Sequence, residues 1–129
     1  MPPSPNSQGL CIVSQIRYIT LVSWRVTFYD SRVESEILAL PAGFLARFIR
    51  YAERMEAFGP DLGMPHTRAI GGGLFELRIK AGEGIARVFY CTIVNRRIVM
   101  LHHFIKKSQR TPRRNLDIAR KRLEELKHG

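Results

Sequence analysis

Apolar and polar residues alternate along several segments of the chain. Between residues 24 and 29, Trp24, Val26 and Phe28 share one side of an extended chain, which predicts a strand. Three later segments, 74–80, 85–94 and 97–105, are also strand-like. Their linkers, AGEG and NR, are short and rich in turn residues, so we expect these strands to be antiparallel neighbours. The last two are apolar on both faces, which is typical of the middle of a sheet covered by helices.

Helical periodicity occupies most of the remaining sequence. Ser31 and Glu34 have the spacing of a capping box, which predicts a short helix that ends before Pro41. A longer helix is predicted over residues 44–58, where apolar side chains recur at i, i+4 spacing. A third helix should begin at Pro112.

The predicted order is strand, helix, helix, three strands and helix. This is an α+β fold with an antiparallel sheet, two N-terminal helices packed on one face, and a C-terminal helix. We interpret residues 61–73 as a loop whose glycine run is a hinge, because no phosphate-binding GK[ST] motif follows it. Residues 1–20 are expected to be a flexible or weakly structured extension, with an edge strand in 10–20 as an alternative, and residues 21–129 to form one domain.

The charge balance points to a polyanionic partner. Among 129 residues there are 21 Lys and Arg against 11 Asp and Glu, a formal charge of +10. Nucleic acid, an acidic protein and an anionic membrane surface all satisfy this balance. Two cysteines are too few for a disulfide scaffold, and we expect a cytoplasmic protein without a signal peptide or membrane span.

Cations are concentrated on the last three predicted strands. Alternation places Arg78 and Lys80 on one face, Arg87 is on the next strand, and Lys106 and Lys107 end the third. Arginine matches phosphate geometry, and a lysine whose pKa is lowered by cationic neighbours can act as a base. Such a group could cleave RNA without metal by activating the 2′-OH, although ordinary solvated charges would give the same pattern.

Two adjacent histidines, His102 and His103, precede these lysines. Successive strand residues face opposite sides, so one histidine should point toward the helix-covered face and the other outward. This arrangement is a poor metal pair, and no acidic or cysteine ligands lie nearby in the sequence. We therefore expect no metal and no cofactor.

Three segments in this order, GGLFELRIK, GIARVFY and IVMLHHFIKKSQRTPRRNLDIARKRLEEL, resemble the RelE/ParE superfamily of toxins, in its phage-type HigB-like branch of type II toxin–antitoxin systems. The similarity covers about residues 24–127. It implies a RelE-like fold, metal-independent endoribonuclease cleavage of mRNA on the ribosome, and a cognate antitoxin in a hetero-oligomer.

The resemblance also implies the site residues. Arg87 is similar to the arginine before the family's VxY pattern, and the remaining catalytic candidates are Arg78, Lys80, Lys106, Lys107 and His103. Three basic residues near the start of the last helix, Arg110, Arg113 and Arg114, are expected to bind RNA. Two other functions share this fold: a ParE-like inhibitor of DNA gyrase, and an inactive module that binds the antitoxin or operator.

Overall fold

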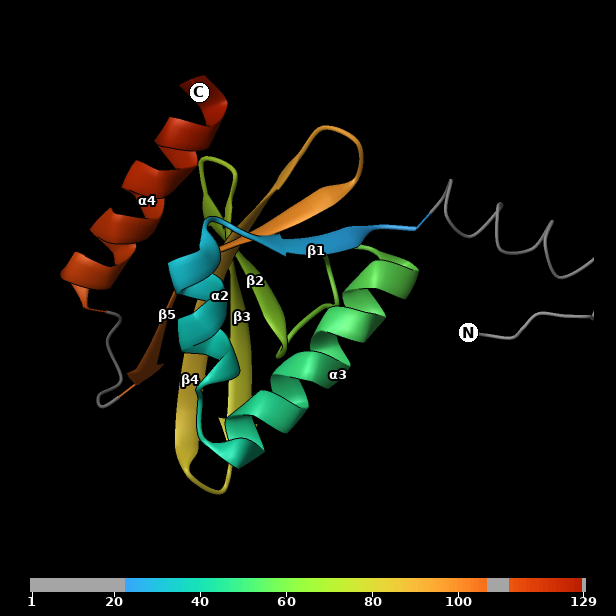
Figure 1. Ribbon diagram of the computed structural model, residues 1–129, viewed down its shortest axis with the longest axis vertical. Helices are drawn as coiled ribbons and strands as arrows, with labels where there is room; N and C mark the ends of the chain where they lie inside the picture. Colours follow the sequence, from blue (N-terminus) through green and yellow to red (C-terminus); the bar gives the residue numbers. More distant parts are fainter. Residues whose placement is uncertain (1–22, 107–111, 129) are drawn as a thin grey trace, which may run out of the picture.

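The computed structural model describes residues 23–106 and 112–128. The secondary structure, shown in Figure 1, comprises the elements β1 (Arg25–Phe28), α2 (Ser31–Leu38), α3 (Ala42–Phe58), β2 (Thr67–Gly71), β3 (Leu74–Ala81), β4 (Gly84–Ile93), β5 (Arg97–Lys106) and α4 (Arg113–His128). The α+β class and the predicted helices and strands are confirmed. The predicted extension, residues 1–20, lies outside the described residues.

The sheet has five strands in the order β1-β5-β4-β3-β2. The three predicted strands, β3, β4 and β5, are antiparallel neighbours as expected, β2 adds a fourth antiparallel strand, and β4 and β5 are internal. β1, however, runs parallel to β5, so the prediction of a wholly antiparallel sheet is wrong. The reason lies in the connection: α2 and α3 carry the chain to the far edge, and the following hairpins return it to β1 in the same direction.

The strand β2 was missed in the sequence, where its residues were interpreted as loop. Thr67–Gly71 pairs with β3, and the register shifts between Ala69 and Gly71. The turn contains Gly72 and Gly73, with φ angles of 66° and 89°. Two consecutive residues with positive φ are what a tight hairpin turn requires. The glycine run is therefore a hairpin turn and not a hinge.

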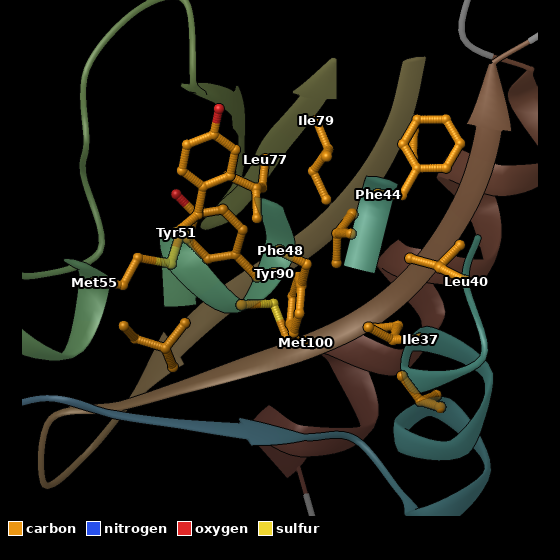
Figure 2. Close-up of a cluster of buried hydrophobic side chains, with 14 residues drawn as sticks. Ile37, Leu40, Phe44, Phe48, Tyr51, Met55, Leu77, Ile79, Tyr90 and Met100 are labelled. Carbon is orange, nitrogen blue, oxygen red and sulfur yellow. The ribbon is translucent and has the colours of Figure 1, made fainter. Parts of the chain in front are cut away.

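Helices α2 and α3 cover one face of the sheet. Their buried side chains, including Ile37, Phe44, Phe48 and Met55, pack against the strands in the larger hydrophobic cluster (Figure 2). The side chains of β1 that were predicted to share a face, Trp24, Val26 and Phe28, all pack against this cluster. The predicted packing of both N-terminal helices on one face is confirmed.

Helix α4 covers part of the opposite face. Ala119 and Leu123 are buried against Leu74, Phe89 and Leu101 in a second cluster. The sheet therefore has helices on both faces, which corrects the expectation that helices cover it on one side. α4 lies beside the end of the sheet that carries the β2–β3 turn, and the β3–β4 turn lies at the other end (Figure 1). We refer to the side that α4 partly covers as the α4 face.

The helices begin within two residues of the predicted positions, and one cap differs from the prediction. The side chain of Asp30, rather than that of Ser31, accepts a hydrogen bond from the Val33 amide at 2.8 Å and caps α2. Asp30 has extended backbone angles, which a cap residue needs, whereas Ser31 is already helical. α3 ends at Gly59, whose φ of 108° favours glycine.

Candidate functional site: a cationic cluster around a buried glutamate

The strand register brings cations from four strands together on the α4 face. Arg78 on β3 lies opposite Arg87 on β4, which lies opposite Phe104 on β5. In the adjacent row, Lys80 and Lys106 both neighbour Ile85. We call the group comprising Arg68, Glu76, Arg78, Lys80, Arg87 and Lys106 the cationic cluster.

A single carboxylate lies within this cluster. Glu76 is 2% exposed, and its Oε1 accepts from Arg87 Nη1 at 2.7 Å and from Arg68 Nη2 at 3.1 Å. Arg87 is itself 8% exposed, whereas the side chain of Arg68 is 52% exposed. Removing one member of a buried ion pair leaves an uncompensated charge, so Glu76 and Arg87 are strongly interdependent. Glu76 therefore fixes the position of Arg87.

Two guanidinium groups retain unused donors. Among the described residues, the buried Nε atoms of Arg78 and Arg87 have no hydrogen-bond partner. Both arginines line a pocket of about 140 Å³ together with Arg68, Glu76 and the segment from Met64 to Thr67. Arg87 lines this pocket although its side chain is largely buried. A phosphate oxygen entering it would meet donors in the fork geometry that suits phosphate.

Lys106 has an altered proton affinity in this setting. Desolvation and the neighbouring positive charge of Arg87 lower the pKa of Lys106 below its ordinary value, with Glu76 acting in the opposite direction. Arg78 and Arg68 add smaller contributions that also lower this pKa. A lysine with a lowered pKa can accept a proton nearer neutral pH than a free lysine can.

Four predicted catalytic residues, Arg78, Lys80, Arg87 and Lys106, are thus brought together. Lys107 and Arg110 lie outside the described residues. Arg113 and Arg114 are exposed at the start of α4. Arg68 and Glu76 were missed as site residues. Arg68 is on the strand interpreted as loop, and Glu76, which alternation puts on the same face as Arg78 and Lys80, was given no role.

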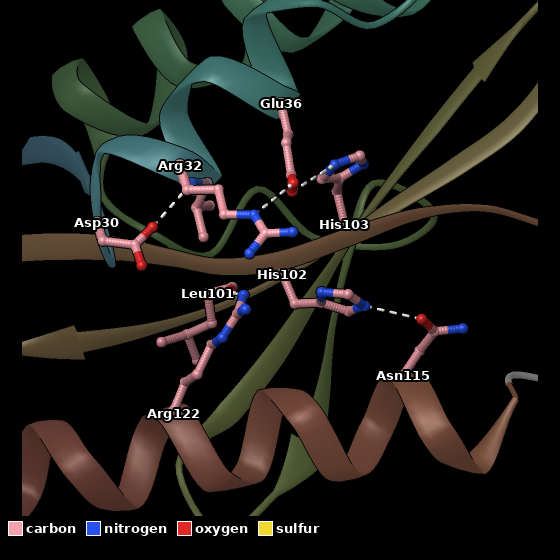
Figure 3. A network of polar contacts seen from close by, with 9 residues as sticks. Asp30, Arg32, Glu36, Leu101, His102, His103, Asn115 and Arg122 are labelled. Atoms are coloured by element: carbon pink, nitrogen blue, oxygen red, sulfur yellow. Dashed lines mark hydrogen bonds and ion pairs between the residues drawn. The ribbon is translucent and has the colours of Figure 1, made fainter.

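The two histidines point to opposite sides of β5, as predicted (Figure 3). His103 lies on the face covered by α2, where its Nε2 is 3.6 Å from Glu36. His102 lies on the α4 face, with its Nε2 2.7 Å from Asn115 Oδ1. Burial lowers the pKa of both rings. His103, a catalytic candidate in the sequence, is therefore on the other side of the sheet from the cationic cluster.

Within residues 23–106 and 112–128, no group of three or more His, Cys, Asp or Glu side chains is arranged to hold a metal ion. None of the helices described there is long and apolar enough to cross a membrane.

Comparison with known families adds an independent observation. The family model described as Phage derived protein Gp49-like (DUF891) matches residues 35–124, more than half of the chain. The chain belongs to the Gp49-like family. This is a RelE/ParE-like toxin family of toxin–antitoxin systems, and it implies a cognate antitoxin as partner. A search of curated proteins finds no match. The matched segment includes the described cationic cluster in full.

Proposed function

We propose that this Gp49-like toxin is a metal-independent endoribonuclease of the HigB-like branch, which cleaves mRNA on the ribosome. The observation that carries the proposal is the arrangement of Lys106, Arg78 and Arg87 around Glu76. Two arginines with unused donors and a lysine of lowered pKa supply the groups that phosphate transfer without metal requires.

In the proposed reaction Lys106, in its neutral form, removes the proton of a ribose 2′-OH. The 2′ oxygen attacks the adjacent phosphorus and forms a new P–O bond, while the bond from phosphorus to the 5′ oxygen breaks. Arg78 and Arg87 donate to the phosphate oxygens, whose charge increases in the transition state. A proton from Lys80 neutralises the leaving 5′ oxygen. The products are a 2′,3′-cyclic phosphate and a 5′-hydroxyl end.

The register supports this division between Lys106 and Lys80. Both residues neighbour Ile85, one on each side of β4, so their Cα atoms are two strand spacings apart, roughly 10 Å. A phosphate above β4 would lie between the two amines, with Arg87 in the adjacent position on the same strand. Base and acid would then approach from opposite sides, as in-line displacement requires.

Other parts of the molecule would hold the substrate and the antitoxin. Arg113 and Arg114 are exposed at the start of α4, and with Arg110 they are proposed to bind the RNA backbone. The net charge of +10 favours an acidic antitoxin segment that covers the cationic cluster. A complex in which Arg78 and Lys106 stay exposed would contradict this mode of inhibition.

The test compares the wild type with Lys106→Arg, which keeps the charge but removes the base. Both proteins are made in a cell-free system and incubated with an mRNA, with and without ribosomes, and new 5′ ends are mapped. We expect internal cuts with 5′-hydroxyl ends for the wild type and at least about a hundredfold fewer for Lys106→Arg. Arg32→Ala, on exposed α2 surface, is the control and should cleave normally.

The same preparation separates the other functions of this fold. If the mRNA stays intact and the protein inhibits supercoiling by purified DNA gyrase, the protein is a gyrase inhibitor and not a nuclease. If neither effect occurs, the chain acts as a binding module for antitoxin or operator DNA. Equal cleavage by Lys106→Arg and wild type would refute the assignment of the base.

A further inference from the structure

A second pocket lies beside the cationic cluster, at the edge of β3. Its volume is about 380 Å³, and its walls come from α3, the segment before β2, and the end of β3. We call it the edge pocket; it is lined by Arg47, Tyr51, Pro65, His66, Arg78, Lys80 and Ala81.

The edge pocket exists because β2 is shorter than β3. β2 pairs with β3 only as far as Leu77, and the next contact is the Arg78 amide, which donates to the His66 carbonyl at 2.8 Å. Beyond this point β3 continues to Ala81 with β4 as its neighbour. The space that another residue of β2 would have filled is bounded by α3 instead.

Its walls combine cations with aromatic rings. Arg47 is exposed on α3, and Lys80 is exposed on β3. Tyr51 and His66 place their rings together, with centroids 5.1 Å apart. Positive grooves with aromatic side chains are the usual means by which proteins hold single-stranded nucleic acid. Among the described residues, no carboxylate lines this pocket.

The edge pocket adjoins the first pocket. Both are lined by Pro65, His66 and Arg78, so Arg78 forms a wall common to the two. A polyanion bound at Arg87 would therefore reach Lys80 and Arg47 by passing Arg78. On the far side of Arg47, a third pocket includes Glu83, whose carboxylate accepts from the Gly43 amide at 3.0 Å. The edge pocket, whose described lining contains no carboxylate, ends there.

We infer that the edge pocket is a second phosphate-binding subsite, in which Arg47 holds the backbone of the RNA strand away from the scissile phosphate. This inference deepens the proposed function, because it extends the substrate path from β4 past the edge of β3. Arg47 contacts phosphate and takes no part in proton transfer. Its loss should weaken binding of the strand uniformly across base sequences.

The experiment measures binding without cleavage. A fluorescent 2′-O-methyl RNA of about twelve nucleotides lacks the free 2′-OH, and its affinity for the full chain is measured by anisotropy between about 50 and 200 mM salt. Arg47→Ala should weaken binding about fivefold and reduce the slope of log K against log salt by about 0.7, the value for one phosphate contact on a single strand. Arg25→Ala is the matched control, because Arg25 is an exposed arginine on β1, at the opposite edge of the sheet. It should change affinity by less than about twofold.

Two results would overturn the subsite. One is equal affinity and salt slope for Arg47→Ala and Arg25→Ala. The other comes from the same assay with polyglutamate as an acidic-peptide probe: binding of polyglutamate that depends on Arg47, while binding of RNA does not. The cleavage assay keeps the two proposals separable. Cleavage by the wild type with no effect of Arg47→Ala on binding refutes the subsite alone. Binding that depends on Arg47 without any cleavage supports the subsite and refutes the nuclease.

Discussion

The ion pairs of Glu76 allow the cationic cluster to form. Like charges on adjacent strands repel, and this repulsion is strong where water is excluded. Glu76 supplies a buried negative charge next to Arg87, the most buried cation of the cluster. This ion pair holds the Arg87 guanidinium in place, while its Nε has no hydrogen-bond partner among the described residues. The carboxylate of Glu76 thus compensates the buried charge of Arg87 and fixes the orientation of its guanidinium.

Replacing Glu76 should therefore be costly to stability. Glu76→Gln leaves Arg87 as a buried charge without a counterion, and we expect the free energy of unfolding to fall by about 3 kcal/mol. The double variant Glu76→Leu/Arg87→Met removes both charges and should lose less than Glu76→Gln alone. Urea denaturation of both variants measures the difference. A double variant at least as unstable as Glu76→Gln would contradict the coupling.

Lys106 gives the proposed reaction a defined pH dependence. The neutral amine is the active form, and desolvation with the charge of Arg87 lowers its pKa from 10.5. The cleavage rate should therefore increase with pH and level off below 10.5. Glu76→Gln removes the neighbour that raises this pKa, so in that variant, where it folds, the plateau should begin at lower pH. A rate independent of pH from 6 to 9 would argue against Lys106 as the base.

Among the secondary-structure elements, α3 depends on a distant turn for its N-terminus. Its N-cap residue, Pro41, has no side-chain hydrogen bond to offer, and no acidic residue lies in its first turn. The carboxylate of Glu83, in the β3–β4 turn, accepts a hydrogen bond from the Gly43 amide. A Cβ atom at position 43 would overlap Glu83 Oε1, so glycine permits this close approach. The hairpin and the helix are thereby joined at the end of the sheet.

Removing this contact should destabilise the fold modestly. Glu83→Ala takes a carboxylate from a helix N-terminus, and we expect a loss of about 1 kcal/mol. Glu53→Ala, at an exposed position in the middle of α3, is the control and should stay within about 0.5 kcal/mol. Thermal denaturation of the wild type, Glu83→Ala and Glu53→Ala measures the two losses of stability. An equal effect of the two substitutions would show that Glu83 does not support the helix.

At the scale of the whole molecule, the adjacent histidines of β5 connect both helical layers to the sheet. His103 meets Glu36 on α2, and His102 meets Asn115 on α4 (Figure 3). The β4–β5 register shifts between Phe89 and Tyr90. Leu101 and His102 therefore both lie on the α4 face, and alternation continues at His103. Arg122 adds a bond to the Leu101 carbonyl at 2.6 Å.

The histidines should make stability dependent on pH. Burial lowers the pKa of both rings from 6.5, so near pH 6 the unfolded chain binds more protons than the folded one. Their contribution is present above pH 6.5 and is lost as the pH falls below it. The urea midpoint should therefore decrease from pH 7.5 to 5.5, and less so in His102→Gln/His103→Gln. His128→Gln, exposed at the end of α4, should match the wild type; identical profiles for all three proteins would contradict this linkage.

The amino-acid sequence by itself determined the helices, three adjacent strands and four members of the cationic cluster. These depend on local periodicity and short hairpins, which place residues such as Arg78 and Arg87 without knowledge of the rest of the chain. The tertiary structure alone decided the parallel pairing of β1 with β5, the position of α4, the separation of His103 from the cluster and the role of Glu76. Each of these depends on contacts between segments distant in the sequence or on opposite sides of the sheet. Periodicity shows which side of a strand a residue occupies, but only packing shows what meets it there.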